Sequence, residues 1–281
     1  MTSDIAPDVP LARAAHKVLE PFHTMVHFVP EAADRYAAEG VSGGMRGYFA
    51  SRSAALGQVP ADVVIATFFN FAPAQVRKAI PSVWDATTPE AILKARFGAA
   101  DAALTRMLGD EVSSPAIEEA AQLAREATTA AGIAGRPLYA AHAALDWPDA
   151  PHLQLWHAAT LLREHRGDGH IAALLLTGLT GVEAVASYVA TGKSLPEELL
   201  RATRGYSEEE WAAAKQRLRD RGTLDADNTF TAAGRAEREW VEEQTDAAAG
   251  APYEHLGEAK TQRLLELVKP WSKSMTKQIF G

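Results

Sequence analysis

The stretch Gly205–Arg235, GYSEEEWAAAKQRLRDRGTLDADNTFTAAGR, decides the expected fold of this chain. Ser207 is followed three residues later by Glu210, and this spacing predicts a capping box at the start of a helix. Apolar side chains then recur at helical spacing, at Trp211, Ala214 and Leu218. Gly222 is expected to end this helix. The stretch therefore begins with one well-delimited helix.

A short hairpin is expected after this helix. Leu224 and Phe230 flank the turn at residues 225–228, and a further helix is expected from Thr231. This order matches that of a winged helix-turn-helix, in which the recognition helix is followed by a wing and then by another helix. The segment Phe230–Arg235, FTAAGR, resembles the Leu-Thr-x-x-Gly-Arg segment that closes the wing of MarR-like regulators. The resemblance covers about residues 195–245 and implies a winged-helix segment with a short β-hairpin wing.

Composition narrows the class of protein. The 281 residues are 47% hydrophobic and rich in alanine, which predicts a mainly α globular fold with one large core or two moderate ones. Cysteine is absent, so disulfides and cysteine-based metal sites are excluded. No signal peptide is recognisable, and the longest apolar runs are too short to span a membrane. We therefore expect a cytoplasmic protein with no membrane partner.

The chain divides at a glycine- and proline-containing linker, residues 132–137. We predict an N-terminal winged-helix-like half at residues 1–131 and a C-terminal winged-helix half at residues 138–281. The glycines in Gly167-Asp168-Gly169 are expected to break a long helix that begins near Pro151. Helices are expected at about 10–29, 31–39, 60–66, 73–80, two within 87–131, 151–166, 170–176, 182–191, 196–202, 207–221, 231–248 and 257–277.

The two halves share a sequence pattern. Val59–Thr67 and Leu195–Thr203 both read apolar-Pro-x-acid-apolar-apolar-x-Ala-Thr. With a gap of two residues, His27 also falls beside His165. We interpret the match as a tandem duplication with a period near 136 residues, which would make the chain a pseudo-dimer of two winged-helix-like halves. The match is short, and chance similarity stays the alternative.

Seven motifs spread over most of the chain carry a wider resemblance: LEPFH (19–23), FVPE (28–31), GYFASR (47–52), ATFFNF (66–71), AAH (140–142), WH (156–157) and LREHRGDGH (162–170). Through them the chain resembles an actinobacterial helix-turn-helix family labelled SalK-like. The resemblance implies a fold and no settled activity. Function must therefore be argued from the candidate site.

The predicted recognition helix is poorly suited to DNA. A DNA-reading helix needs side chains that reach base edges, and its wing needs basic residues for phosphate. Here the helix opens with three glutamates, residues 208–210, and the wing carries Asp225 and Asp227 but no arginine. The net charge of −8 also weakens a phosphate-binding interpretation. We predict a retained scaffold, with DNA binding disfavoured unless Arg201, Arg204, Arg217 and Arg221 form one basic stripe.

The densest polar cluster is Arg163–His170, and it supplies most of the predicted catalytic residues. Histidine titrates near neutral pH, so His165 is the predicted acid/base group, oriented by Glu164 or Asp168. A helix start after the glycine break would present backbone N–H groups to an anion. The alternative is a solvated ion pair, a helix cap and a turn. The predicted catalytic set is His165, Glu164, His27, Asp168 and His170.

A ligand pocket is predicted around His27 and His165, which the duplication would place face to face. Its walls would be mostly apolar with a few polar groups, as in small-molecule sites. The alternative is that the aromatic residues, including Phe22 and Phe28, are ordinary core. The predicted ligand-binding residues are His23, Arg46, Tyr48, Phe49, Arg52, Phe68, Asn70, Phe71, Trp156, His157 and Arg163.

Metal and cofactor motifs are not evident. His23 and His27 have the i, i+4 spacing of a metal-binding pair, but a hydrogen-bonded core histidine is the preferred interpretation. No phosphate-binding loop, dinucleotide fingerprint or nucleophile elbow is present. We therefore expect neither a metal nor a cofactor.

Three functional hypotheses stay open. The first is a winged-helix-derived protein that binds a small apolar or anionic molecule, with a cofactor-free cyclase, isomerase or lyase of natural-product metabolism as its catalytic form. The second is a ligand-responsive transcriptional regulator of MarR type. The third is an interaction protein without catalysis. The acidic recognition helix and wing favour the first over the second, and the sequence does not specify an oligomeric state.

Overall fold

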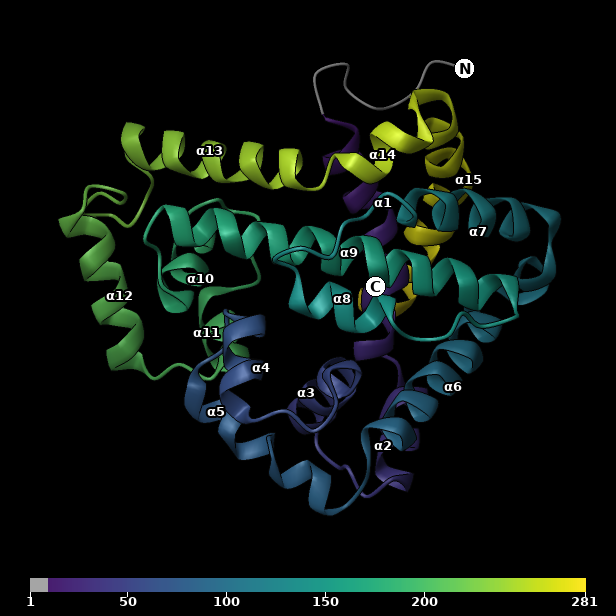
Figure 1. Cartoon of the computed structure of the whole chain (residues 1–281). Coiled ribbons are helices and arrows are strands. Elements are labelled where there is room, and N and C mark those ends of the chain that lie inside the picture. The colour runs from purple at the N-terminus through teal and green to yellow at the C-terminus, as the bar shows by residue number, and fades with distance from the viewer. Residues whose placement is uncertain (1–9) are drawn as a thin grey trace. The chain divides into compact units, whose positions relative to one another are not determined.

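The computed structural model describes residues 10–281, and within them the fold is mainly helical, as predicted (Figure 1). Over this range the predicted hairpin wing is a single antiparallel bridge between Leu224 and Phe230. The chain separates into two compact units. The first unit contains the described residues up to Gln58 together with Val83–Asp168 and Asp246–Gly281, and the second contains Val59–Ser82 and Gly169–Thr245.

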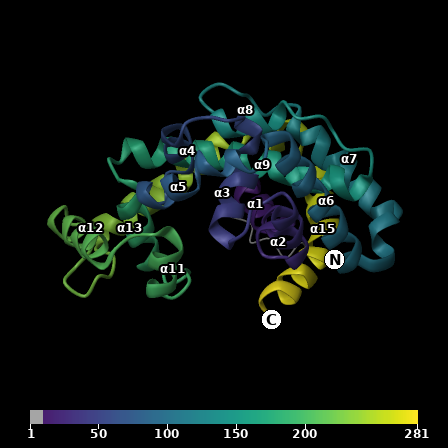
Figure 2. The same cartoon turned by 90° about the horizontal axis from the view of Figure 1, so that it is seen from below.

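Within the described residues, the first unit contains eight whole α-helices and parts of two others. In it α1 lies against α15, and α2 lies against α6 (Figures 1 and 2). Its helices are α1 (Leu11–Thr24), α2 (Pro30–Ala38), α3 (Gly44–Ser53), α6 (Pro89–Leu108), α7 (Pro115–Thr128), α8 (Pro137–Ala143), most of α9 (Pro151–Leu176), the end of α13 (Ala232–Ala248), α14 (Ala251–Leu256) and α15 (Glu258–Phe280).

Local sequence explains where several of these helices begin. The Thr88 and Ser114 side chains cap α6 and α7 by accepting the backbone N–H groups of Ala91 and Ile117, and a proline follows each cap. Both starts were predicted. The first helix is shorter than predicted, because α1 ends at Thr24 and a 3₁₀ turn, Met25–His27, follows.

The predicted helix break at Gly167-Asp168-Gly169 is wrong, because α9 continues without interruption to Leu176. Each glycine disfavours a helix by only about 1 kcal/mol. Tertiary contacts outweigh that penalty: the Asp168 carboxylate accepts the Tyr139 backbone N–H at 2.9 Å, and Gly167 leaves room for the Arg163 guanidinium. The backbone N–H groups here are therefore not those of a helix start, and the predicted anion site at this break does not form.

The second unit contains α4 (Ala61–Phe68), α5 (Pro73–Ala79), α10 (Gly181–Val189), α11 (Glu197–Arg204), α12 (Glu208–Asp220) and the greater part of α13. The predicted capping box of α12 is confirmed, since Ser207 and Glu210 exchange side-chain-to-backbone bonds. A second capping box, Thr180 with Glu183, starts α10. The buried face of α12 packs into the core of this unit through Trp211, Ala214 and Leu218.

The duplicated sequence pattern has a matching geometry. Helices α4 and α11 each span eight residues and each follows a proline, Pro60 or Pro196. Each ends at a residue with positive φ, 51° at Phe69 and 79° at Gly205. The two compact units do not coincide with the predicted halves 1–131 and 138–281, since each unit draws on both. The duplication and those halves stay predictions.

Among the helices of residues 10–281, none on its own is both long and apolar enough to cross a bilayer. The pair α9 and α10, bent by 97°, meets the length and composition requirements only when taken together.

Candidate functional site

Three arginines surround a buried glutamate in the first unit; Arg52 and Arg96 are buried and Arg163 is partly exposed. Arg52 lies on α3, Arg96 on α6, and Arg163 and Glu164 on α9. We call these four residues the arginine cluster. Arg163 and Arg52 lower the pKa of Glu164, and Glu164 acts to raise the pKa of Arg96. Glu164 is therefore within electrostatic range of all three arginines.

Glu164 is held by two of the arginines. Arg52 donates from Nε to Oε1 and from Nη2 to Oε2, both at 2.8 Å, and Arg163 donates from Nη1 to Oε2 at 2.7 Å. Burial alone would raise the pKa of Glu164, but the charges of Arg163 and Arg52 hold it well below the ordinary value of 4.5. Arg52 is itself fixed by a bond from Nη1 to the Tyr48 hydroxyl at 3.1 Å. Glu164 is therefore an ionised anchor of the cluster.

Arg96 is the least compensated of the three arginines. It is only 1% exposed, and its guanidinium lies 5.2 Å from the Trp156 ring centre. Its Nη1 and Nη2 atoms are buried and make no well-aligned hydrogen bond, and neither do Trp156 Nε1 and the Tyr36 hydroxyl, although that hydroxyl lies close enough to this guanidinium to affect its pKa. A buried donor without a partner costs about 1–3 kcal/mol, and more when it is charged. Most of these atoms are donors, so the complementary group is an acceptor or an anion.

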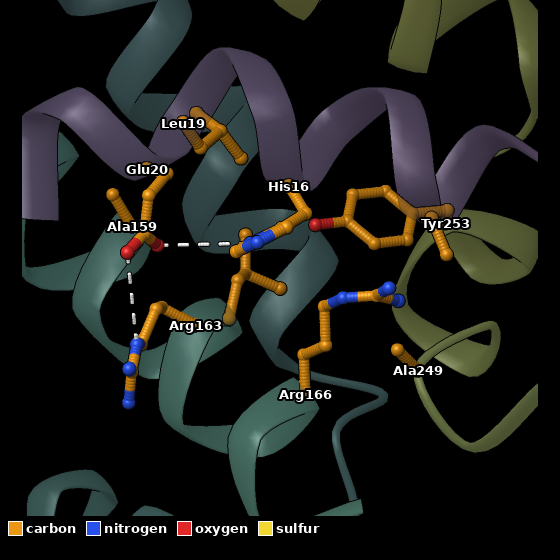
Figure 3. Close-up of a pocket in the computed structure, with 10 residues that line it drawn as sticks. His16, Leu19, Glu20, Ala159, Arg163, Arg166, Ala249 and Tyr253 are labelled. Atoms are coloured by element: carbon orange, nitrogen blue, oxygen red, sulfur yellow. Dashed lines mark ion pairs between the residues drawn. The ribbon is translucent and has the colours of Figure 1, made fainter. Parts of the chain in front are cut away.

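Glu20 lies at the edge of the cluster. Its Oε1 is 3.9 Å from Arg163 Nε, and its Oε2 is 3.6 Å from His16 Nδ1 (Figure 3). Burial raises the pKa of Glu20 to about 7, and Arg163 partly opposes the shift. The side chain keeps 29% of its surface exposed and lines a cleft of about 10 Å³, which has room for about one water molecule. Glu20 is therefore a carboxyl group that exchanges its proton near neutral pH and has access to solvent.

His23 and His27 adjoin the cluster as neutral imidazoles. Burial is the main cause that lowers both pKa values well below 6.5, and Arg163 and Arg96 add to the shifts of His23 and His27 respectively. His23 Nδ1 lies 3.2 Å from Thr160 Oγ1, whose own proton goes to the Trp156 carbonyl, so Nδ1 is the donor. His27 Nε2 is buried without a partner. In residues 10–281, no three His, Asp or Glu side chains gather as metal ligands.

Several predicted ligand-binding residues meet at this cluster. The His27 ring centre lies 4.8 Å from that of Tyr48 and 5.5 Å from that of His23, with the rings steeply tilted in both pairs. Phe49 packs 5.6 Å from Tyr48. Arg46 is half-buried on the same helix, α3. The predicted residues in or beside the cluster are His23, His27, Tyr48, Phe49, Arg52, Trp156, Arg163 and Glu164.

Other predicted residues have different surroundings. The His165 ring packs 5.1 Å from Tyr139, and burial lowers its pKa to about 4. Tyr139 therefore contacts both His165, through its ring, and Asp168, through its backbone N–H. His27 is not among the rings that pack against His165. His157 packs against Trp147 at 4.9 Å. Phe22 is core, Phe28 is exposed beside Phe280, and the second unit contains Phe68, Asn70, Phe71 and His170.

Sequence reasoning missed Arg96, Tyr36 and Glu20. A signal for Arg96 existed, because it lies four residues after Ile92 and four before Ala100, on the buried stripe of α6. Glu20 appeared only as a letter of the LEPFH motif. Its apolar neighbours Leu19 and Phe22 gave no indication that its carboxyl group would lie beside Arg163.

The second unit shows which family the chain belongs to. Helices α11 and α12 are joined by the short turn Gly205–Ser207, with α10 packed against both. A sequence model of a helix-turn-helix family matches residues 12–280. The chain belongs to this helix-turn-helix family. No curated protein and no solved structure matches the chain significantly.

In this helix-turn-helix protein, the basic residues of α11 and α12 are paired within the second unit. Arg217 Nε donates to Glu183 at 2.6 Å, and Arg221 Nη2 donates to Glu237 at 2.6 Å. Arg201 Nη2 lies 3.1 Å from Glu208. The guanidinium of Arg204 lies over the Phe71 ring at 4.8 Å. Carboxylates of the same unit thus compensate three of the four arginines that sequence analysis singled out as a test for DNA binding.

Proposed function

We propose that this helix-turn-helix protein binds a small molecule with an anionic group, and that the arginine cluster receives that group. The observation that carries the proposal is Arg96, whose two terminal nitrogens are buried and make no well-aligned hydrogen bond. Buried charges in proteins are nearly always paired or hydrogen-bonded. A carboxylate of a ligand would accept two parallel bonds from such a guanidinium.

The charge balance of the cluster supports an anion. Arginine stays protonated in proteins, so Arg52, Arg96 and Arg163 carry three positive charges at neutral pH. Glu164 opposes one of them, and Glu20, with a pKa of about 7, is only partly ionised. The cluster therefore keeps a net positive charge in a region where water screens it poorly. Trp156 and Tyr36 provide a further donor and a hydroxyl group beside that charge.

The proposal extends to catalysis, in which the protein would act on its bound molecule by acid–base chemistry. A general acid or base works best when its pKa lies near the working pH. Glu20 meets that condition, and neutral His27 offers a second ring nitrogen close to Tyr48. A cofactor-free cyclase, isomerase or lyase of natural-product metabolism would use such groups to move one proton while the arginines hold the anionic end of the substrate.

A ligand-responsive regulator of MarR type is the alternative, and membership of a helix-turn-helix family favours it. Against it stand the exposed glutamates at the start of α12 and the ion pairs of Arg201, Arg217 and Arg221. Each phosphate contact that a basic side chain does not make lowers DNA affinity and its dependence on salt. We therefore propose that the winged-helix segment serves as a scaffold, and we disfavour DNA binding.

Native mass spectrometry of the purified full-length protein tests the proposal. We expect the wild type to retain a small anionic molecule, either co-purified or taken from a panel of carboxylic acids. Arg96→Met should lose it, because methionine keeps much of the side-chain volume and removes the charge. The matched control is Arg106→Met on the same helix, whose guanidinium is largely exposed and pairs with Glu31. It should retain the molecule.

Fluorescence anisotropy with labelled DNA from the gene's own upstream region tests the alternative. Salt-dependent, sequence-specific binding by a wild type that carries no small molecule would overturn the proposal and establish the regulator. Equal retention of the small molecule by the wild type and Arg96→Met would remove the arginine cluster as its site. His165→Ala belongs in the same series, because it tests the predicted acid/base residue directly.

A further inference from the structure

The second unit contains a partly open cavity of about 220 Å³. Five polar side chains line it: Asn70, His170, Tyr188, Arg204 and Arg238. Leucine, alanine and valine side chains of α9, α10 and α11 form the rest of the wall. The lining thus combines convergent polar groups with apolar surface, and small-molecule sites contain both. An apolar cavity of roughly 150 Å³ holds one benzene molecule, so this cavity has room for a single ring with two polar substituents.

Close backbone packing lies next to Asn70, one of the residues that line the cavity. The turn between α4 and α5 passes directly over Gly181, where a Cβ atom would lie 2.0 Å from the Phe69 carbonyl oxygen. The start of α5 likewise meets Gly205, which combines a φ of 79° with no room for a Cβ beside Gln75. Phe69 itself has a φ of 51°, a strained conformation for a bulky residue that costs of order 1–3 kcal/mol. Such strain gathers at ligand sites, and here it positions the next residue, Asn70.

Two guanidinium groups are held at the cavity by aromatic rings. Arg204 lies 4.8 Å from the Phe71 ring centre, and Arg238 lies 5.7 Å from that of Tyr188. Arg238 also pairs with Glu242, one turn further along α13. Ring contacts and this ion pair restrict both side chains before a ligand arrives, which lowers the entropy lost on binding.

Asn70 adds a different requirement. Its Oδ1 atom is buried without a hydrogen-bond partner, so a donor on a ligand that reaches this side chain would satisfy it. His170 is fixed nearby: the Thr245 hydroxyl gives its proton to the Val241 carbonyl at 2.6 Å, so it accepts from His170 Nδ1 at 2.9 Å. The site therefore combines an anion-binding wall with one acceptor that calls for a donor.

We propose that this cavity is a second ligand site, for a small hydroxycarboxylic acid. Its carboxylate binds Arg204 and Arg238, its apolar body lies against α10 and α11, and its hydroxyl donates to Asn70 Oδ1. The site shares no residue with the arginine cluster, so it does not depend on the function proposed above.

Calorimetric titration of the full-length protein with 4-hydroxybenzoate, benzoate and phenol tests this assignment. We expect 4-hydroxybenzoate to bind most tightly and benzoate roughly tenfold more weakly, because it lacks one buried hydrogen bond. Phenol should bind at least about tenfold more weakly than 4-hydroxybenzoate, since bonds to charged groups are stronger. Arg204→Gln should weaken both acids by about tenfold or more. Arg235→Gln on α13, an exposed arginine whose Nη1 donates to the Phe230 carbonyl, should leave all affinities unchanged.

Asn70→Ala sharpens the test, because it should reduce the affinity for 4-hydroxybenzoate to that for benzoate and leave benzoate itself unaffected. Ala184→Leu, which fills the cavity, should abolish binding of both acids while circular dichroism remains that of the wild type. Absence of binding to the wild type, or unchanged affinities in Arg204→Gln and Ala184→Leu, would overturn the assignment. If Arg96→Met abolishes binding and Arg204→Gln does not, the acids occupy the arginine cluster and the second site is refuted.

Discussion

The arginine cluster and the predicted recognition helix α12 use arginine in opposite ways. Arg96 is 1% exposed, and two of its nitrogens make no well-aligned hydrogen bond. Arg217 on α12 has a side chain that is 50% exposed and donates to Glu183 within its own unit. A paired surface arginine adds little to stability, whereas a buried and incompletely paired one is costly. This difference points to the interior of the first unit, rather than to α12, as the functional region.

The largest expected effect comes from removing the anion that holds the arginine cluster together. Glu164→Gln leaves Arg52 buried without a counter-charge and removes one partner of Arg163, so we expect the free energy of unfolding to fall by about 3–5 kcal/mol. The matched control is Glu208→Gln, which removes the partner of Arg201 at a site where the glutamate is 81% exposed. It should change stability by less than about 1 kcal/mol. Urea denaturation measures both, and equal effects would erase the contrast between the two regions.

In the second unit, close backbone packing should contribute more to stability than charge does. Gly181→Ala would place a Cβ atom 2.0 Å from the Phe69 carbonyl oxygen, and we expect a loss of about 1–3 kcal/mol from the forced shift. Gly178→Ala is the comparison, because Gly178 has a positive φ but nothing within 4 Å of its Cβ position. It should cost only the backbone strain, about 1 kcal/mol. If Gly181→Ala is the milder of the two in thermal melts, the close approach of these segments is wrong.

Glu20 should make the first unit sensitive to pH. Its folded-state pKa of about 7 lies above the ordinary 4.5, so the folded protein holds a proton that the unfolded chain has lost between those values. Stability attributable to Glu20 therefore falls as pH rises from about 4.5 to about 7. Glu20→Gln keeps the neutral form, so its stability relative to the wild type should rise by about 1–2 kcal/mol between pH 5 and pH 8, allowing for the partly exposed side chain.

The difference between the two proteins isolates Glu20, because the buried histidines titrate alike in both. A difference in stability that does not change with pH would show that Glu20 titrates as an ordinary surface carboxyl group.

The capping box of α12 should give the smallest of these effects. Ser207→Ala removes the hydroxyl that accepts the Glu210 backbone N–H at 3.1 Å, and we expect a loss of about 1 kcal/mol. Ser42→Ala, at an exposed serine before α3, should be neutral within about 0.5 kcal/mol. A neutral Ser207→Ala in the same denaturation series would mean that α12 is stabilised by its buried face alone.

Helix starts were predictable because their causes are local. Thr88, Ser114 and Ser207 cap the backbone within three residues of themselves, so a short sequence window contains the whole interaction. The break expected at residues 167–169 failed for the opposite reason. Its outcome depends on Tyr139, about thirty residues away, whose backbone N–H binds Asp168.

The candidate site was predictable only in part. Tyr48, Arg52 and Glu164 stood out as polar residues within recognisable motifs, and they do meet in the structure. Arg96 lies in an alanine-rich helix, and its burial depends on which helices cover that face. The raised pKa of Glu20 arises from burial, which Arg163, more than a hundred positions away in the sequence, only partly opposes. Such long-range packing is not encoded in any local pattern.

A crystal structure of the purified protein at a resolution that distinguishes ions from water gives the most direct test of the central claim. The account predicts a non-water group with acceptor atoms within hydrogen-bond distance of both Arg96 Nη1 and Nη2. In Glu164→Gln the site would become more positive, and the same group should persist there. Arg96 nitrogens bonded only to water or to protein atoms in the wild type would contradict the claim that the arginine cluster receives an anion.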